Sequence, residues 1–177
     1  MTDIFNEEQI QSSVKSLALQ IYNSNFNQLV FIGLGDNGSI LAKRMANVLL
    51  KEFNVTILVG TLDVTLYKSH DSKEHFITIG ETSINFSLQG KTVVLISDQV
   101  NSGKTMIAGL NALSDYGEPL EIKCCSLIYR DCMTRPIYFH YKGKVIAKED
   151  VPSLKISFYE KDGEDSIKEG LNYETHV

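Results

Sequence analysis

The sequence predicts an α/β fold with a mainly parallel central sheet flanked by helices. Short apolar runs typical of buried strands alternate along the chain with amphipathic helical stretches, which is the order expected of parallel strands connected through helices. The chain has 177 residues and no internal repeat, low-complexity tract or Pro/Gly-rich linker. We therefore expect residues 1–177 to form a single domain, with ligand sites beyond the carboxyl ends of its strands.

The first three elements are a helix, a strand and a second helix. Apolar residues at three- and four-residue spacing predict a helix over 7–23, with Asn6 as its cap. The apolar run 28–32 ends at a glycine and predicts a buried strand. A second stretch with helical spacing covers residues 39–51.

The middle of the chain supplies strands around a polar segment. The run 55–59 is apolar and the run 62–67 alternates, so both predict strands. Residues 68–80 are mostly polar and without a clear period in their first half, which indicates a mobile loop with a short hairpin at its end. The strand at 93–96 has the most buried pattern in the chain.

The last elements are one helix and three strands. A helix is predicted over 105–116, because Gly117 and Pro119 follow it as stop signals. The remaining strands are predicted over residues 122–129, 137–141 and 154–159.

Composition and charge restrict the class of protein. An apolar fraction of 43% with 22% charged residues is typical of a globular protein, and no apolar run approaches the roughly 20 residues that span a bilayer. Residues 1–8 are acidic and lack a secretory signal, so we expect no membrane partner and a cytoplasmic location. The odd set of Cys124, Cys125 and Cys132 predicts reduced thiols. A net charge of -5 disfavours an indiscriminate nucleic-acid binder.

Residues 33–38 carry glycines spaced G-x-G-x-x-G between a predicted strand and a predicted helix. Glycines let the backbone approach a pyrophosphate, and a helix N-terminus favours anions. The dinucleotide fingerprint also requires an acid about 20 residues further on, at the end of the next strand. Asp63 lies 25 residues beyond Gly38 and within a later run. A Rossmann-type dinucleotide site therefore rests on this hexapeptide alone, and a tight glycine turn without a ligand explains it equally well.

Residues 97–105 combine an acidic residue with groups that could donate hydrogen bonds to a phosphate, all at the end of one predicted strand. Their Gly-Lys-Thr ending is that of a P-loop, but such a loop requires glycine where Asp98 stands, so the sequence disfavours a nucleoside triphosphatase. Asp98 could accept hydrogen bonds from two ribose hydroxyls. The backbone N–H groups of 102–105 and the hydroxyls of Ser102 and Thr105 could surround a phosphate. Capping of a turn by Asp98 and of the helix by Ser102 explains each residue singly, but not their combination.

The block 93–105 resembles the 5-phosphoribosyl 1-diphosphate signature of the type I phosphoribosyltransferases, in which apolar residues, two acids and a short turn precede Thr-Gly-Arg-Thr or a variant. Further blocks resemble the bacterial pyrimidine operon attenuation regulators that double as uracil phosphoribosyltransferases. They lie at residues 41–44, 59–67, 136–137, 141–144 and 162–165. The resemblance covers nearly the whole chain. It implies the type I phosphoribosyltransferase fold, with a small hood and a flexible loop.

The resemblance also implies residue roles and a Mg2+ cofactor, whose ligands it leaves unassigned. Asp98 would be the catalytic residue and hold the ribose hydroxyls. The 5'-phosphate and ribose would be bound with Asn101, Ser102, Gly103, Lys104 and Thr105. The pyrophosphate loop would contain Gly35, Asp36, Asn37 and Gly38. The base-reading hood would contain Tyr129 and Arg130, and the flexible loop Tyr67 and Lys68.

Several positions depart from the family pattern. Ser97 replaces the first acid of the signature, and Asp36-Asn37 stand where the subfamily has Thr-Arg. A charge-assisted hydrogen bond to the diphosphate contributes about 1.5–3 kcal/mol, which is lost with the arginine. An aspartate about 4 Å from a phosphate charge would cost on the order of 4 kcal/mol at a surface-like dielectric. Unless Mg2+ or a lysine from another loop compensates, we expect slow turnover or none.

Three functions follow from these observations. The leading hypothesis is a phosphoribosyltransferase-like protein whose ancestral reaction converts uracil and 5-phosphoribosyl 1-diphosphate to UMP and diphosphate. Its partners would be that substrate or a nucleoside monophosphate, and further copies of the chain in a homodimer or larger homo-oligomer. The second is a non-catalytic nucleotide sensor that regulates pyrimidine genes through leader RNA. Its RNA surface could include Lys43, Arg44 and Lys51, which are equally explained as a solvated helix face. The third is the dinucleotide binder.

Overall fold

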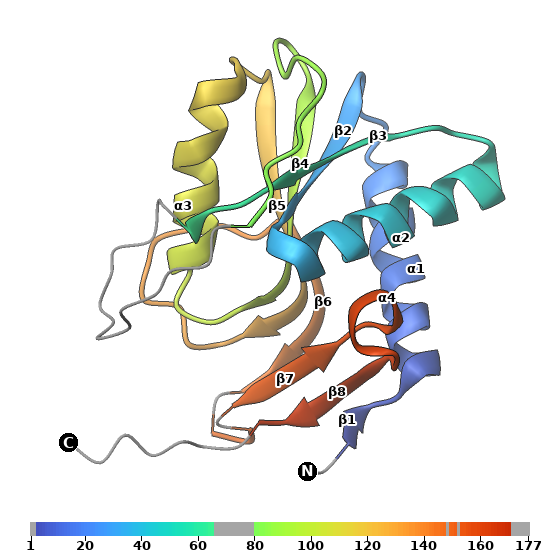
Figure 1. Cartoon of the computed structure of the whole chain (residues 1–177), viewed down its shortest axis with the longest axis vertical. Coiled ribbons are helices and arrows are strands. Elements are labelled where there is room, and N and C mark those ends of the chain that lie inside the picture. Colours follow the sequence, from blue (N-terminus) through green and yellow to red (C-terminus); the bar gives the residue numbers. More distant parts are fainter. Residues whose placement is uncertain (1–2, 66–79, 148, 152, 171–177) are drawn as a thin grey trace.

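The computed structural model describes residues 3–65, 80–147, 149–151 and 153–170, and these form two sheets (Figure 1). The larger sheet has five strands in the order β3-β2-β4-β5-β6, and all of its neighbouring strands are parallel. This confirms the predicted α/β class and parallel central sheet. The strands are β2 (Leu29–Leu34), β3 (Leu58–Leu62), β4 (Thr92–Val100), β5 (Glu121–Arg130) and β6 (Tyr141–Ile146).

Helices cover both faces of the parallel sheet. Helices α1 (Glu7–Asn23) and α2 (Gly35–Phe53) pack on one face, and α3 (Lys104–Leu113) packs on the other (Figure 1). Side chains on a strand alternate between the two faces. Accordingly, Cys125 belongs to the apolar cluster on the side of α1 and α2, and Cys124 to the cluster on the side of α3. All three cysteines are free thiols, as predicted, and burial raises the pKa of Cys124 to about 11.

The predicted helices are present, with different starts and ends in two of them. The range of α1 agrees with the prediction, because Asn6 and Gln9 form a capping box in which each side chain accepts a hydrogen bond of 3.0 Å from the other's backbone N–H. Helix α2 begins at Gly35, before the predicted residue 39. The helix predicted to end at residue 116 ends at Leu113 and continues as a short 3-10 helix, η2 (Ser114–Tyr116).

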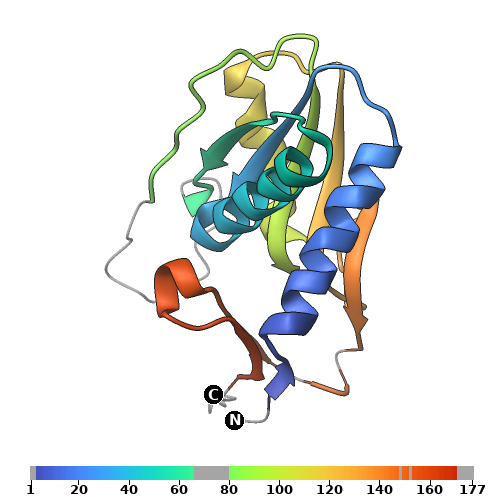
Figure 2. The same cartoon turned by 90° about the vertical axis from the view of Figure 1, so that its right-hand side faces the viewer.

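A second sheet of three antiparallel strands has the order β1-β8-β7 and lies below the carboxyl end of the parallel sheet in Figures 1 and 2. Its strands are β1 (Asp3–Phe5), β7 (Leu154–Ser157) and β8 (Ser166–Glu169). A single helical turn, α4 (Tyr159–Asp162), connects β7 to β8. Strands β1 and β8 were not predicted, because three or four residues are too few to show a period.

Four predicted strands need correction, and two of them lie in the first half of the chain. The run 55–59 is displaced to β3, because α2 extends to Phe53 and ends on Asn54 in a left-handed conformation (φ 56), so the next residues must reverse the chain. The run 62–67 continues β3 only at Leu62; the Asp63 carboxylate then accepts hydrogen bonds from the Thr65 backbone (3.2 Å) and hydroxyl (2.7 Å), which favours a turn. Residues 66–67 lie outside the described residues.

The other two corrections lie near the C-terminus. The predicted strand 137–141 is displaced to β6, which begins at Tyr141. Ile137 N donates to the Arg135 carbonyl at 2.8 Å, so this segment turns before it joins the sheet. The strand predicted over 154–159 ends at Ser157, where the chain leads into α4. The predicted hairpin and mobile loop at 68–80 fall outside the described residues, except for Gly80. No helix in the described ranges is long and apolar enough to cross a membrane.

Candidate functional site

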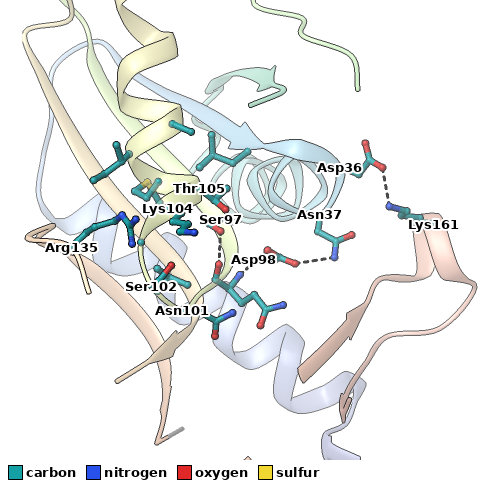
Figure 3. A pocket seen from close by; sticks show the side chains of 17 residues that line it. Asp36, Asn37, Ser97, Asp98, Asn101, Ser102, Lys104, Thr105, Arg135 and Lys161 are labelled. Carbon is teal, nitrogen blue, oxygen red and sulfur yellow. Dashed lines mark hydrogen bonds and ion pairs between the residues drawn. The ribbon is translucent and has the colours of Figure 1, made fainter. Parts of the chain in front are cut away.

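A cavity of about 760 Å³ opens at the carboxyl ends of β2 and β4 (Figure 3). These strands are parallel neighbours, with Gly33 paired to Ile96, so the segments that follow them lie side by side. Ligands of α/β sheets bind at such strand ends. The described residues that line the cavity are Leu34, Asp36, Asn37, residues 97–108, Arg135 and Lys161.

The phosphate segment predicted over 97–105 forms one wall of this cavity. Helix α3 begins at Lys104, and its cap is Gly103 in a left-handed conformation (φ 85) with no side-chain cap hydrogen bond. The alternative in which Ser102 caps the helix is therefore wrong. A Cβ atom at Gly103 would also lie 3.1 Å from Ile137 Cδ1, so glycine suits the position sterically. Because no side chain caps it, the N-terminus of α3 can receive an anion.

Asp98 lies at the centre of the cavity near the end of β4. One carboxylate oxygen accepts the Gln99 backbone N–H at 2.7 Å, and the other accepts the Asn37 amide at 2.9 Å. Burial raises the pKa of Asp98, and the hydrogen bonds from Asn37 and Gln99 and the charge of Lys161 oppose that rise. Ser97, at the position of the family's first acid, donates its hydroxyl to the Gln99 carbonyl at 2.7 Å. Asp98 is therefore a partly buried carboxylate in this wall of the cavity.

The glycine segment 33–38 is not the loop that the sequence predicted. Gly33 belongs to β2, and α2 begins directly at Gly35. A Cβ atom at Gly33 would lie 2.4 Å from Ser39 Cα, and one at Gly38 would lie 2.6 Å from the Ile96 carbonyl oxygen. Both glycines are thus required by close packing of the first turn of α2 against the sheet. Neither glycine lines the cavity, so packing explains their spacing without a bound dinucleotide.

Asp36 and Asn37 connect the first turn of α2 to the second sheet. Asp36 forms an ion pair with Lys161 of α4 at 2.8 Å. Asn37, besides holding Asp98, donates to the Ile156 carbonyl of β7 at 3.3 Å. Both of these hydrogen bonds are donated by Nδ2 of Asn37, whereas its side-chain oxygen, Oδ1, is buried and has no hydrogen-bond partner. Sequence reasoning missed Lys161, because nothing in the acidic segment around it indicates that it reaches α2.

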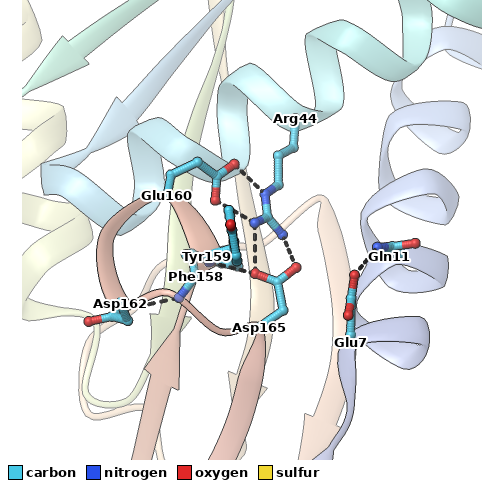
Figure 4. A network of polar contacts seen from close by, with 8 residues as sticks. All are labelled: Glu7, Gln11, Arg44, Phe158, Tyr159, Glu160, Asp162 and Asp165. Atoms are coloured by element: carbon cyan, nitrogen blue, oxygen red, sulfur yellow. Dashed lines mark hydrogen bonds and ion pairs between the residues drawn. The ribbon is translucent and has the colours of Figure 1, made fainter.

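Arg44 holds α4 in place beside α2 (Figure 4). Its guanidinium donates two hydrogen bonds of 2.7 Å to Asp165, pairs with Glu160, and lies 4.8 Å from the ring centroid of Phe158. Desolvation acts to raise the pKa of Asp165, but the hydrogen bonds and charge of Arg44 outweigh it and the pKa is lowered. Only 18% of the Arg44 side chain is exposed, so the interpretation of Arg44 as part of a solvated helix face is wrong.

The predicted hood residues have different surroundings. Arg130 is buried and donates to the Val151 carbonyl, and it lines a second cavity of about 350 Å³ that shares Gln99, Asn101 and Ser102 with the first. Tyr129 packs edge-on against Phe139 and under the Lys142 ammonium, and it lines neither of these cavities. The predicted loop residues Tyr67 and Lys68 lie outside the described residues.

The described residues contain no group of three or more His, Cys, Asp or Glu side chains that could by itself hold a metal ion. Mg2+ is usually bound by one or two carboxylates together with substrate phosphates. Asp98, next to the segment that can receive a phosphate, fits that kind of shared site. The carboxylate of Asp63 accepts hydrogen bonds from its own loop, including the Gly80 backbone at 2.8 Å, so it gives no independent support to a ribose of a dinucleotide.

Comparison with known proteins gives a consistent result. Residues 1–156 match the family model described as a phosphoribosyl transferase domain. The bifunctional protein PyrR of Synechocystis sp. is 32% identical over 168 residues, which cover 94% of each chain. That of Nostoc punctiforme is 34% identical over 172 residues, covering 95% of this chain and 96% of the relative.

Solved structures resemble the whole fold. A hypoxanthine-guanine phosphoribosyltransferase from Bacillus anthracis superposes with a TM-score of 0.73 at 19% identity, covering 97% of this chain and 99% of the other. A purine phosphoribosyltransferase from Pyrococcus horikoshii gives a TM-score of 0.60 at 20% identity, with coverages of 81% and 90%. At these identities the likeness concerns the fold alone.

Proposed function

Because this chain belongs to the phosphoribosyl transferase family, we propose that it binds a phosphorylated ribose and transfers it between uracil and diphosphate. The reaction would be uracil plus 5-phosphoribosyl 1-diphosphate giving UMP and diphosphate. One observation carries the proposal: the partly buried carboxylate of Asp98 and the uncapped N-terminus of α3 line the same cavity. The ribose hydroxyls and the 5'-phosphate of one ligand require that combination.

The 5'-phosphate would bind at residues 101–105. The N-terminus of α3 offers backbone N–H groups without a competing cap, and its first turn contains no acid. Ser102 and Thr105 add hydroxyl donors, and Lys104 and Arg135 bring positive charge to this end of the cavity. A dianionic phosphate is favoured there on each of these grounds.

Asp98 would accept hydrogen bonds from the ribose hydroxyls and stabilise positive charge on the ribose as the bond to diphosphate breaks. In such a reaction most of the acceleration comes from positioning and from charge stabilisation. Mg2+ bound by Asp98 together with the ligand would neutralise charge on the departing diphosphate. With Ser97 in place of a second acid, the chain supplies one carboxylate here, and we expect slow turnover.

The base would lie toward the second cavity, beyond Asn101 and Ser102. This cavity adjoins the phosphate segment, and Arg130 lines it, which supports the role expected for that residue. Because Tyr129 lines neither of these cavities, Arg130 is the better supported of the two predicted hood residues.

The proposal is tested by calorimetry of the full-length protein with UMP and with 5-phosphoribosyl 1-diphosphate, each with Mg2+. We expect both to bind. If neither binds, the site assignment fails. A parallel assay for UMP formation from uracil then measures turnover, and binding of both ligands without any UMP formation would leave a binding protein rather than an enzyme.

A second function is supported by the relatives, whose printed name is bifunctional protein PyrR. We propose that the chain also binds leader RNA of pyrimidine genes in a nucleotide-dependent way. Arg44 is committed to Asp165 and Glu160, so an RNA surface on α2 would have to use Lys43 and Lys51. A gel-shift titration with and without UMP tests this, and an RNA affinity that UMP does not change would contradict it. Size-exclusion chromatography would test the expected homo-oligomer.

A further inference from the structure

Lys161 reaches the ligand cavity from a part of the chain that contributes no other charged lining residue. It belongs to α4, and its ammonium pairs with Asp36 at 2.8 Å at the rim of the cavity. In Figure 3, Asp98 lies between this pair on one side and Lys104 and Ser102 on the other. Positive charge therefore flanks Asp98 on both sides.

Two helix N-termini converge on the same cavity from these two sides. Helix α3 begins at Lys104, and α2 begins at Gly35; neither has a side-chain cap hydrogen bond. A helix N-terminus favours a negative group, and at α2 that group is at present Asp36, in the first turn. Consider a ligand with one phosphate at the N-terminus of α3 and a second anionic group on the far side of its ribose. The second group would compete with Asp36 for the N-terminus of α2 and for Lys161.

The ion pair of Asp36 with Lys161 is suited to exchange. Side chains of the two residues are 66% and 50% exposed, and exposed ion pairs contribute little to stability. The backbone of α4 is fixed independently, because Arg44 binds Glu160 and Asp165 on either side of Lys161. Lys161 can therefore change its partner without a change in the fold.

We propose that Lys161 binds the diphosphate group of 5-phosphoribosyl 1-diphosphate, exchanging Asp36 for the ligand when the substrate enters. The inference rests on the proposed function, since it names the residue that holds one end of that substrate. It also accounts for the replacement of the loop arginine by Asn37: the cation is supplied from α4.

Calorimetry with two ligands tests this on the full-length protein in the presence of Mg2+. UMP and 5-phosphoribosyl 1-diphosphate share the ribose and 5'-phosphate, but only the second carries the diphosphate. We expect Lys161→Gln to weaken binding of 5-phosphoribosyl 1-diphosphate about tenfold or more, and to change UMP binding by less than about twofold. Lys161→Arg should retain most of the affinity.

Lys168→Gln is the matched control. Lys168 lies in β8, the strand that follows α4, and forms an ion pair of 2.7 Å with Glu164, but it does not line the cavity, so its loss should leave both affinities unchanged. An unchanged affinity for 5-phosphoribosyl 1-diphosphate in Lys161→Gln, or an equal loss for both ligands, would overturn the inference while leaving the proposed function in place. If the unaltered protein binds neither ligand, the proposed function itself fails.

Discussion

The Asn37 side chain donates a hydrogen bond of 2.9 Å to the Asp98 carboxylate and thereby joins the first turn of α2 to the end of β4. This amide fixes the orientation of Asp98 without neutralising it. The partly buried carboxylate accepts hydrogen bonds from neutral donors, and desolvation of its charged form is the largest cause of the raised pKa of Asp98. If Asp98 holds the ribose as proposed, we expect ligand affinity to depend on pH.

Asn37→Ala should make UMP binding more sensitive to acid. The Asn37 hydrogen bond lowers the pKa of Asp98, so its loss raises that pKa further, and a protonated Asp98 accepts ribose hydroxyls less well. We expect the UMP affinity to fall at a higher pH in the variant than in the unaltered protein, as calorimetry over a pH series would measure. Asn47→Ala removes an exposed amide from the same helix and should not move the profile. Identical profiles for both variants would contradict the role of Asn37.

Asp98→Asn should weaken ligand binding while stabilising the fold. The folded-state pKa lies above the ordinary aspartate value of 3.8, so ionised Asp98 opposes folding at neutral pH, and this cost is relieved as the pH falls through the raised pKa. The neutral asparagine side chain of the variant removes that cost. An increase of about 1 kcal/mol in the free energy of unfolding would raise Tm by roughly 2–4 °C. Loss of charge-assisted hydrogen bonds to ribose should weaken UMP binding roughly tenfold or more.

Thermal unfolding and calorimetry on the same Asp98→Asn sample measure both effects. Glu118→Gln removes an exposed carboxylate just after η2; it is the control and should change neither. A variant that is less stable than the unaltered protein would show that Asp98 has a structural role in place of the proposed one.

Arg44→Met should destabilise the attachment of α4 and the second sheet. The Arg44 side chain is 18% exposed and that of Asp165 only 5%, so removal of the arginine leaves a buried carboxylate without its partner. Breaking a buried pair in this way costs about 3–5 kcal/mol. Lys15→Met breaks a pair with Glu52 whose side chains are 51% and 43% exposed, and should cost less than about 1 kcal/mol.

Urea denaturation separates the two variants and also tests the expected single domain. If residues 1–177 unfold as one unit, Arg44→Met lowers the midpoint of a single transition; two separate transitions would contradict that expectation. Because the pKa of Asp165 is lowered, the stability that the pair supplies should be present near neutral pH and be lost as the pH falls through that lowered pKa.

The sequence allowed prediction of what is local and periodic. The range of α1 follows from its capping box and apolar spacing. The segment 97–105 carries Asp98 and the groups that could donate hydrogen bonds to a phosphate in one stretch of chain. The ligand roles of that segment stay predictions. The contacts of Asp36 with Lys161 and of Arg44 with Asp165 join residues 125 and 121 positions apart. No period or motif indicates such contacts, because they arise only when the second sheet packs against the start of α2.

The double variant Asp36→Thr with Asn37→Arg should bind 5-phosphoribosyl 1-diphosphate more tightly. Threonine removes a negative charge from the first turn of α2 and releases Lys161 from its ion pair, and arginine adds a charged donor at the same place. One charge-assisted hydrogen bond contributes about 1.5–3 kcal/mol, which corresponds to roughly a tenfold or larger decrease in Kd.

The single variant Asp36→Thr keeps the hydrogen bond between Asn37 and Asp98, so it separates the release of Lys161 from the added arginine. UMP lacks the diphosphate, and its affinity should stay nearly constant in Asp36→Thr. A Kd for 5-phosphoribosyl 1-diphosphate that is unchanged in both variants would show that the first turn of α2 does not contact the diphosphate.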